Sequence, residues 1–234
     1  LRDLFYELDR SEELVDILRR LSIIVTERQA LISIYHELAD HLMHRRNDLV
    51  EARLYLEKVI TLDPDSIQAL ISMGDSYALD GQPLRALKVF GSAARTTSAQ
   101  DDDATAAKLH LRIADLWSGP LGEPKSALVS IRRALDHQPD NDRCLQRGIE
   151  LALALKTPDG ALGFVEQLTA LRESQIDNAA QGPEQNQALA AARTAHLLAA
   201  DVAESRGRDD TAADALVTGS TLERCRAVRA KLPL

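Results

Sequence analysis

Apolar residues recur along the chain three and four positions apart, the spacing of one helix face, and no run shows the alternation of a strand. Proline and glycine interrupt this pattern at regular intervals, so we predict short helices joined by turns. In one such turn, Gly81 is expected to take the left-handed conformation that ends a helix, and Pro83 to begin the next helix. Pro64 and Pro139 are each expected to close a helix, because the residue before a proline is driven out of the helical region.

A short anchor recurs along the sequence and predicts a repeat. It consists of an alanine, a large apolar residue four positions later and a small or apolar residue three positions after that, all on one helix face. Its copies are Ala52-Leu56-Val59, Ala86-Phe90-Ala93, Ala127-Ile131-Ala134 and Ala161-Val165-Leu168, with a weaker copy at Ala212-Leu216-Gly219. The leading alanines of the first four copies are 34, 41 and 34 residues apart. We expect each anchor to lie on the second helix of a helix pair.

The second anchor completes a pattern that resembles the tetratricopeptide repeat (TPR). The residues that carry the resemblance are Leu70, Met73, Gly74, Tyr77, Ala86, Phe90 and Ala93. Leu70 stands where the family has a tryptophan, and Ser98 stands where it has a closing proline. The resemblance implies an all-α fold, an α-α superhelix in which antiparallel helix pairs stack as a right-handed solenoid. We identify the chain as similar to a divergent bacterial TPR array and, because it begins inside a repeat, expect it to be a fragment of a longer array.

The neighbouring repeats depart further from the family pattern. In the preceding repeat, His36 takes the tryptophan place and Asp40 the glycine place, and in the following repeat Asp115 takes the glycine place and Ser118 the tyrosine place. The predicted organisation is a partial N-terminal repeat over 1–32, repeats over 33–66, 67–107, 108–141 and 142–174, a polar loop over 175–187, and a degenerate repeat with a capping helix over 188–234.

Several segments outside the regular repeats also carry predictions. Residues 101–107 begin with three aspartates and are expected to extend a helix with an acidic first turn; adjacent side chains cannot face one cation. Residues 174–187 are rich in Asn, Gln and Ser and are expected to form an exposed loop. Residues 1–8 and 11–24 are expected to form the first helix pair. The basic last helix, 221–232, is expected to cap the array, and binding to an acidic surface is the alternative.

Composition narrows the class of protein. The chain has 234 residues, 45% of them hydrophobic, which is enough to form a core without disulfides. Its formal net charge of −8 argues against nucleic acid as a partner. No uncharged stretch is long enough to span a bilayer, so we expect no membrane insertion. Cys144 and Cys225 lie 81 residues apart, which suits a reducing compartment, and we expect a cytoplasmic location.

One group of residues suggests metal chemistry. His36, His41 and His44 lie close together in sequence with Glu37 and Asp40, but the first two histidines are one residue too far apart for the zinc-protease motif. A surface reading is preferred, in which His41 and His44 join Arg45 and Arg46 in a positive patch that strengthens as the pH falls. There is no phosphate-binding glycine loop and no nucleophile elbow, and Cys144 has no histidine nearby in sequence. We therefore expect no metal, no cofactor and no catalytic residue.

The family resemblance implies a partner-binding surface, because the first helix of each TPR pair lines a concave groove. The residues expected there are Glu37, His41, His44, Gln68, Ile71, Asp75, Arg112, Leu116, Arg143, Gln146 and Glu150. Charges of both signs would face the partner, a protein or peptide, and Ile71 and Leu116 would be apolar anchors. The ordered Lys and Asn set that clamps a terminal carboxylate in some relatives is missing.

Three functions remain open from the sequence. The first is a non-enzymatic protein-interaction scaffold. The second is a regulatory or sensor domain whose groove binds a small peptide. The third, least favoured, is a metal-dependent enzyme that uses His36, His41 and His44. The sequence leaves the oligomeric state open.

Overall fold

The structure is a computed structural model that describes residues 11–178, 190–192, 194–195 and 202. Within these residues the regular structure is helical, with no strand. The helices are α2 (Ser11–Ile24), α3 (Arg28–His44), α4 (Leu49–Leu62), α5 (Ile67–Leu79), α6 (Pro83–Ala99), α7 (Asp103–Ser118), α8 (Pro124–His137), α9 (Asp142–Ala154) and α10 (Pro158–Asn178). None of these helices combines the length and the apolar character needed to cross a bilayer.

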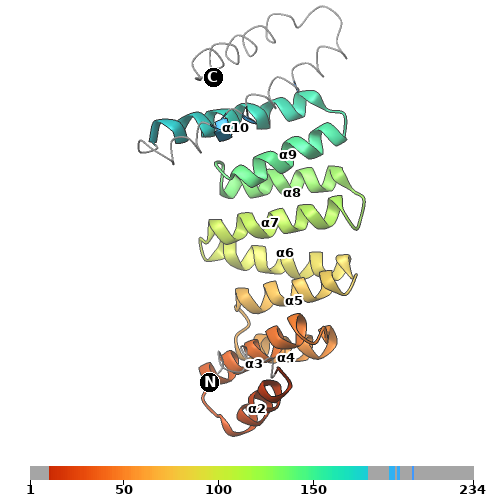
Figure 1. Cartoon of the computed structure of the whole chain (residues 1–234), viewed down its shortest axis with the longest axis vertical. Coiled ribbons are helices and arrows are strands. Elements are labelled where there is room, and N and C mark those ends of the chain that lie inside the picture. Colours follow the sequence, from red (N-terminus) through yellow and green to blue (C-terminus); the bar gives the residue numbers. More distant parts are fainter. Residues whose placement is uncertain (1–10, 179–189, 193, 196–201, 203–234) are drawn as a thin grey trace, which may run out of the picture. The chain divides into compact units, whose positions relative to one another are not determined.

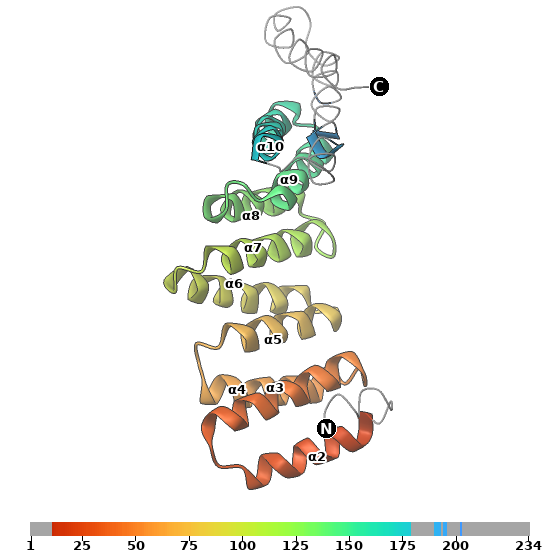
Figure 2. The same cartoon turned by 60° about the vertical axis from the view of Figure 1, so that its left-hand side comes forward.

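The chain divides into two compact units, Leu1–Leu116 (unit 1) and Trp117–Leu234 (unit 2). In unit 1, each helix from α2 to α5 contacts the next one along the chain, and α5, α6 and α7 lie in chain order in both views (Figures 1 and 2). In unit 2, α9 contacts both α8 and α10. The predicted all-α array of helix pairs is confirmed, including the helix predicted over 11–24.

Local signals fix where the helices begin and end. Gly81 has the predicted positive φ of 67°, and α6 begins at Pro83 as predicted. α4 ends two residues before Pro64, and α8 ends two residues before Pro139, again as predicted. After each of these prolines a polar side chain caps the next helix: Ser66 Oγ accepts the backbone N–H of Ala69, and Asn141 Oδ1 accepts that of Cys144.

The turn inside each helix pair has one recurring form. The residue before the second helix donates its backbone N–H to a carbonyl near the end of the first helix, and the residue just before that donor has a positive φ. The donor–acceptor pairs are Asp48–Leu42, Gln82–Tyr77, Glu123–Trp117 and Thr157–Ala152, at 2.8, 2.9, 2.7 and 2.9 Å. The positive-φ residues are Asn47, Gly81, Gly122 and Lys156. These turns identify equivalent positions in the four pairs.

This equivalence corrects the predicted positions on two of the first helices. The carbonyl acceptor lies five residues before the donor in the Gly81 turn, but six residues before it in the turns after α3 and α7. The residues equivalent to Gly74 are therefore Ala39 and Ala114, which are fully buried, and not Asp40 and Asp115. For the same reason Trp117, and not Ser118, takes the tyrosine place.

The anchors on the second helices lie as predicted. Ala52, Ala86, Ala127 and Ala161 have no exposed surface, and Phe90 is 2% exposed. The Phe90 ring packs so closely on α5 that a Cβ added to Gly74 would lie 2.3 Å from its Cε1. In unit 2, a Cβ added to Gly148 would lie 3.0 Å from the Phe164 ring. This second pair was not predicted, although its 16-residue spacing is that of Gly74 and Phe90.

The irregular segments follow the predictions only in part. α6 has 17 residues and α7 begins at Asp103, so the acidic segment lengthens the helices around it as predicted. Asp102 caps α7, because its Oδ1 accepts the backbone N–H of Thr105 at 3.1 Å. The predicted start of the polar loop at residue 174 is too early, because α10 continues to Asn178. Residues 1–8, the rest of that loop and the predicted helix over 221–232 lie outside the described residues.

Candidate partner-binding face

Four carboxylates occupy one equivalent position on the first helices. Each lies two residues before the residue whose carbonyl accepts the turn hydrogen bond. They are Asp40 on α3, Asp75 on α5, Asp115 on α7 and Glu150 on α9. Sequence reasoning placed Asp75 and Glu150 on the partner-binding face but assigned Asp40 and Asp115 to packing positions. Asn47 and Gly122 mark where these two turns end, but their residue types do not show that each turn is one residue longer than the Gly81 turn.

Two residues predicted to meet a partner bind each other in unit 1. Arg112 Nη1 on α7 donates to both carboxylate oxygens of Asp75 on α5, at 2.5 and 2.7 Å. The two side chains are 46% and 37% exposed, so water reaches the pair. The Arg112 guanidinium also lies 5.8 Å from the centre of the Phe90 ring. This pair, called the clasp below, joins two successive first helices at the surface and covers part of the core.

The other predicted residues of unit 1 are only partly accessible. His44 and Gln68 are exposed, and Glu37 and Ile71 are half-buried. His41 is 2% exposed and does not line an open face, because the longer turn after α3 shifts the register of that helix by one residue. Leu116 is 9% exposed and packs inside, so it cannot be the exposed anchor that the sequence suggested.

On α9 in unit 2, Arg143, Gln146 and Glu150 are exposed as predicted. Glu150 Oε2 accepts from Arg147 Nη1 at 2.7 Å, and Arg147 Nη2 donates to Ser118 Oγ at 2.8 Å. Gln146 Nε2 donates to Asp142 Oδ2 at 3.1 Å. α9 therefore presents ordered charged and amide groups to solvent.

The histidines of α3 do not come together as metal ligands. Among the described residues, no three His, Cys, Asp or Glu side chains gather closely enough to hold a metal ion. His41 is buried, so the predicted positive patch cannot include it, whereas exposed His44 has its Nε2 3.5 Å from Asp40. Burial lowers the pKa of His36 against an opposing effect of Asp63, and burial together with Arg45 lowers the pKa of His41.

Lowering the pH below about 6.5 is expected to reduce the free energy of unfolding. Histidine in the unfolded chain has a pKa near 6.5, whereas burial keeps the native pKa of His36 and His41 lower. The unfolded chain then binds protons that the native protein does not, so this stability is present above that pH and is lost as the pH falls toward the native pKa values. Urea unfolding at several pH values measures the slope. His41→Gln should flatten it, and an unchanged slope in this variant would count against this account.

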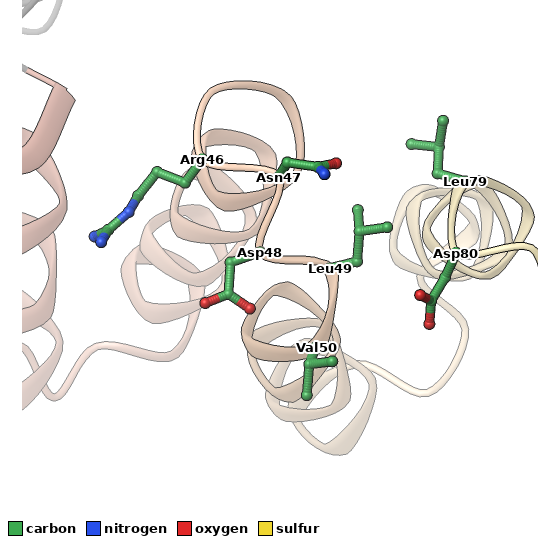
Figure 3. A pocket seen from close by; sticks show the side chains of 7 residues that line it. All are labelled: Arg46, Asn47, Asp48, Leu49, Val50, Leu79 and Asp80. Carbon is green, nitrogen blue, oxygen red and sulfur yellow. The ribbon is translucent and has the colours of Figure 1, made fainter.

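A surface hollow of about 490 Å³ lies in unit 1 between the α3–α4 turn and the end of α5. Leu49 and Leu79 point to one side of it, and the carboxylates of Asp48 and Asp80 point to the other (Figure 3). Both carboxylates are occupied, since Asp48 caps α4 through the Glu51 N–H and Asp80 pairs with Arg53 Nη2 at 2.9 Å. The hollow is therefore a product of the turn, with polar groups that already serve the fold.

Solved structures with a similar fold are helical repeat proteins. The MamA protein is 17% identical, with a TM-score of 0.52 over 87% of this chain and 96% of that chain. A double mutant of MamA from strain RS-1 is 16% identical, with a TM-score of 0.55 over 74% of this chain and 93% of that chain. A variant of a Podosopora anserina protein with nearly identical TPR-like repeats is 15% identical, with a TM-score of 0.53 over 88% of this chain and 98% of that chain.

At this identity the likeness concerns the fold, and it confirms the predicted resemblance to TPR arrays at that level. No protein-family model and no curated protein sequence matches the chain.

Proposed function

We propose that this TPR-like array is a non-enzymatic scaffold that binds a segment of another protein on its first helices, which are α3, α5 and α7 in unit 1 and α9 in unit 2. The observation that carries the proposal is the shared position of Asp40, Asp75, Asp115 and Glu150. The second helices anchor the packing through small residues, and the first helices instead repeat a charged group at the surface. Within unit 1, a charge that recurs once per repeat offers successive contacts to an extended or helical segment.

The chemistry of the face favours selective binding. In unit 1 the clasp fixes charges of both signs at the surface, and on α9 of unit 2 the Arg147–Glu150 pair does the same. Such groups contribute to specificity and to the rate of association more than to raw affinity. Half-buried Ile71 on α5 adds an apolar contact, which Leu116 does not.

Reversing Arg112 and Arg143 to Glu is expected to weaken partner binding by more than about tenfold and to reduce its salt dependence. Arg112→Glu removes the clasp and sets a second negative charge beside Asp75, and Arg143→Glu inverts an exposed charge on α9. Partners are first captured from native lysate, and the affinity of the purified partner is then measured at several salt concentrations. The circular dichroism of the double variant should match that of the unchanged protein.

The matched control is Arg133→Glu, which inverts an exposed charge on α8, a second helix. It should leave the affinity unchanged. A partner that binds the double reversal as tightly as the unchanged protein would show that it uses another surface.

The clasp also favours a second candidate function, a sensor that responds to a small peptide. Because one ion pair joins α5 and α7, a ligand that replaces either partner would change the spacing of these helices. Small-angle scattering separates the two functions: a scaffold keeps its radius of gyration when the segment binds, and a sensor changes it.

A further inference from the structure

The clasp has an equivalent place one repeat earlier that lacks its arginine. Arg112 lies five residues before Trp117, the turn acceptor of its helix pair, and Ser72 lies five residues before Tyr77. The carboxylate that Arg112 binds is Asp75, and the equivalent carboxylate on the preceding first helix is Asp40. The repeat therefore places Asp40 opposite Ser72, whose hydroxyl is too short to replace a guanidinium.

We infer that Asp40 binds an arginine or lysine side chain of the protein partner, at the place that Arg112 fills in the next repeat. The inference rests on the proposed function, because it assigns a chemical class to one contact of the same face. The clasp is its template, since this protein itself shows a guanidinium held by the equivalent carboxylate, with one Nη within 2.7 Å of both oxygens.

The surroundings of Asp40 suit a cation. Its side chain is 63% exposed, more than the 37% of Asp75 in the clasp, so a partner can reach it. His44 lies beside it, with its Nε2 3.5 Å from Oδ1 of Asp40, and leaves most of the carboxylate exposed. Glu37 lies one helical turn earlier, and its Oε1 is buried with no hydrogen-bond donor from the described residues. Asp40 and Glu37 therefore place two carboxylates on successive turns of α3.

The same place offers a path for the stem of a long basic side chain. Ile71 is next to Ser72 on α5, and His36 is one turn before Asp40 on α3; both are half-buried. Arginine and lysine commonly lay their methylene groups along such apolar surface while the charged end stays in water. Arg112 does the equivalent in the clasp, where its guanidinium lies 5.8 Å from the centre of the Phe90 ring.

The test uses the full chain and a phage-displayed library of random dodecapeptides as the probe. Peptides selected on the unchanged protein are expected to be richer in Arg and Lys than those selected on Asp40→Asn. Synthetic peptides from the first pool should lose about tenfold in affinity on Asp40→Asn, the loss expected for one hydrogen bond to a charged group. Ser72→Arg should weaken them similarly, because it supplies the missing cation from within the chain. Asp136→Asn, an exposed site on α8, should have no effect.

Two other outcomes separate this inference from the proposed function. Peptides that weaken with Ile71→Ala and the double reversal, but bind Asp40→Asn unchanged, would overturn the inference and leave the proposed face in place. Peptides whose affinity is unchanged by Asp40→Asn, by Ile71→Ala and by the double reversal would count against both the proposed function and the inference. A library that yields no binding peptide would do the same.

A measurement without any ligand checks the geometry itself. If Ser72 faces Asp40 as Arg112 faces Asp75, Ser72→Arg should raise the melting temperature by about 1–3 °C, the usual worth of an exposed ion pair. The rise should vanish in the double variant Ser72→Arg/Asp40→Asn. An equal rise in both backgrounds would mean that the two positions do not face each other, and the inference would fail.

Discussion

Phe90→Ala is expected to destabilise the protein by about 3–5 kcal/mol, the usual loss when a buried aromatic side chain is removed from a core. The ring is 2% exposed on α6, contacts α5 at Gly74 and lies beneath the guanidinium of Arg112. Removing the ring would leave a cavity. Because the ring lies directly against α5 at Gly74, this cavity cannot close unless a helix moves. Urea unfolding followed by circular dichroism measures the loss.

The control for this change is Leu84→Ala on the same helix. Leu84 is 66% exposed, so its removal should change the unfolding free energy by less than about 0.5 kcal/mol. Equal effects of the two substitutions would mean that Phe90 does not lie in the core of the α5–α6 pair.

Gly74→Ala is expected to cost about 1–3 kcal/mol, although alanine normally favours a helix over glycine. The added Cβ would lie 2.3 Å from Phe90 Cε1 and 2.5 Å from its Cδ1, distances that real carbon atoms do not adopt. The ring or the helix must therefore move. The loss should shrink when the ring is also shortened, so Gly74→Ala/Phe90→Leu should lose less than the sum of the two single changes.

Two other helix glycines calibrate this result. A Cβ added to Gly148 would lie 3.0 Å from the Phe164 ring, so a small shift of the ring can relieve the contact and Gly148→Ala should cost less than Gly74→Ala. A Cβ added to Gly163 meets nothing within 4 Å, so Gly163→Ala should be neutral or stabilise by up to about 1 kcal/mol. If Gly74→Ala changes the free energy of unfolding as little as Gly163→Ala does, Gly74 does not lie as close to the Phe90 ring as described.

The second helices could be predicted well from the sequence because their signals are local. An alanine anchor, a proline at the first turn and a capping Ser or Asn act within one helix, and each leaves its own trace in the residue order. Ala86, Phe90 and Pro83 therefore lie where the pattern placed them.

The first helices were harder, because their register depends on the length of the turn that follows. A turn with Asn47 or Gly122 before the helix cap spans one residue more than the turn with Gly81, and residue types alone do not show the difference. One residue rotates a helix position by about 100°, enough to exchange a buried site with an exposed one. This is why His41 proved buried, and why Asp40 and Asp115 were missed on the face.

Asp75 and Arg112 were each predicted from the sequence as partner-binding residues. The ion pair between them was not predicted. Asp75 and Arg112 are 37 residues apart, and each reads as an exposed charge that could meet a partner. Sequence spacing gives no measure of the distance between successive first helices, so it could not show that these two charges form an ion pair with each other.

The turn inside each helix pair can differ in length without changing how the helices pack. The five- and six-residue versions end in the same backbone hydrogen bond and the same left-handed residue, and buried small side chains still meet the neighbouring helix in both. An added residue is taken up at the edge of the repeat and leaves the core unchanged. These corners are thus the positions where the array can gain or lose residues during evolution, and where engineered insertions would disturb the helices least.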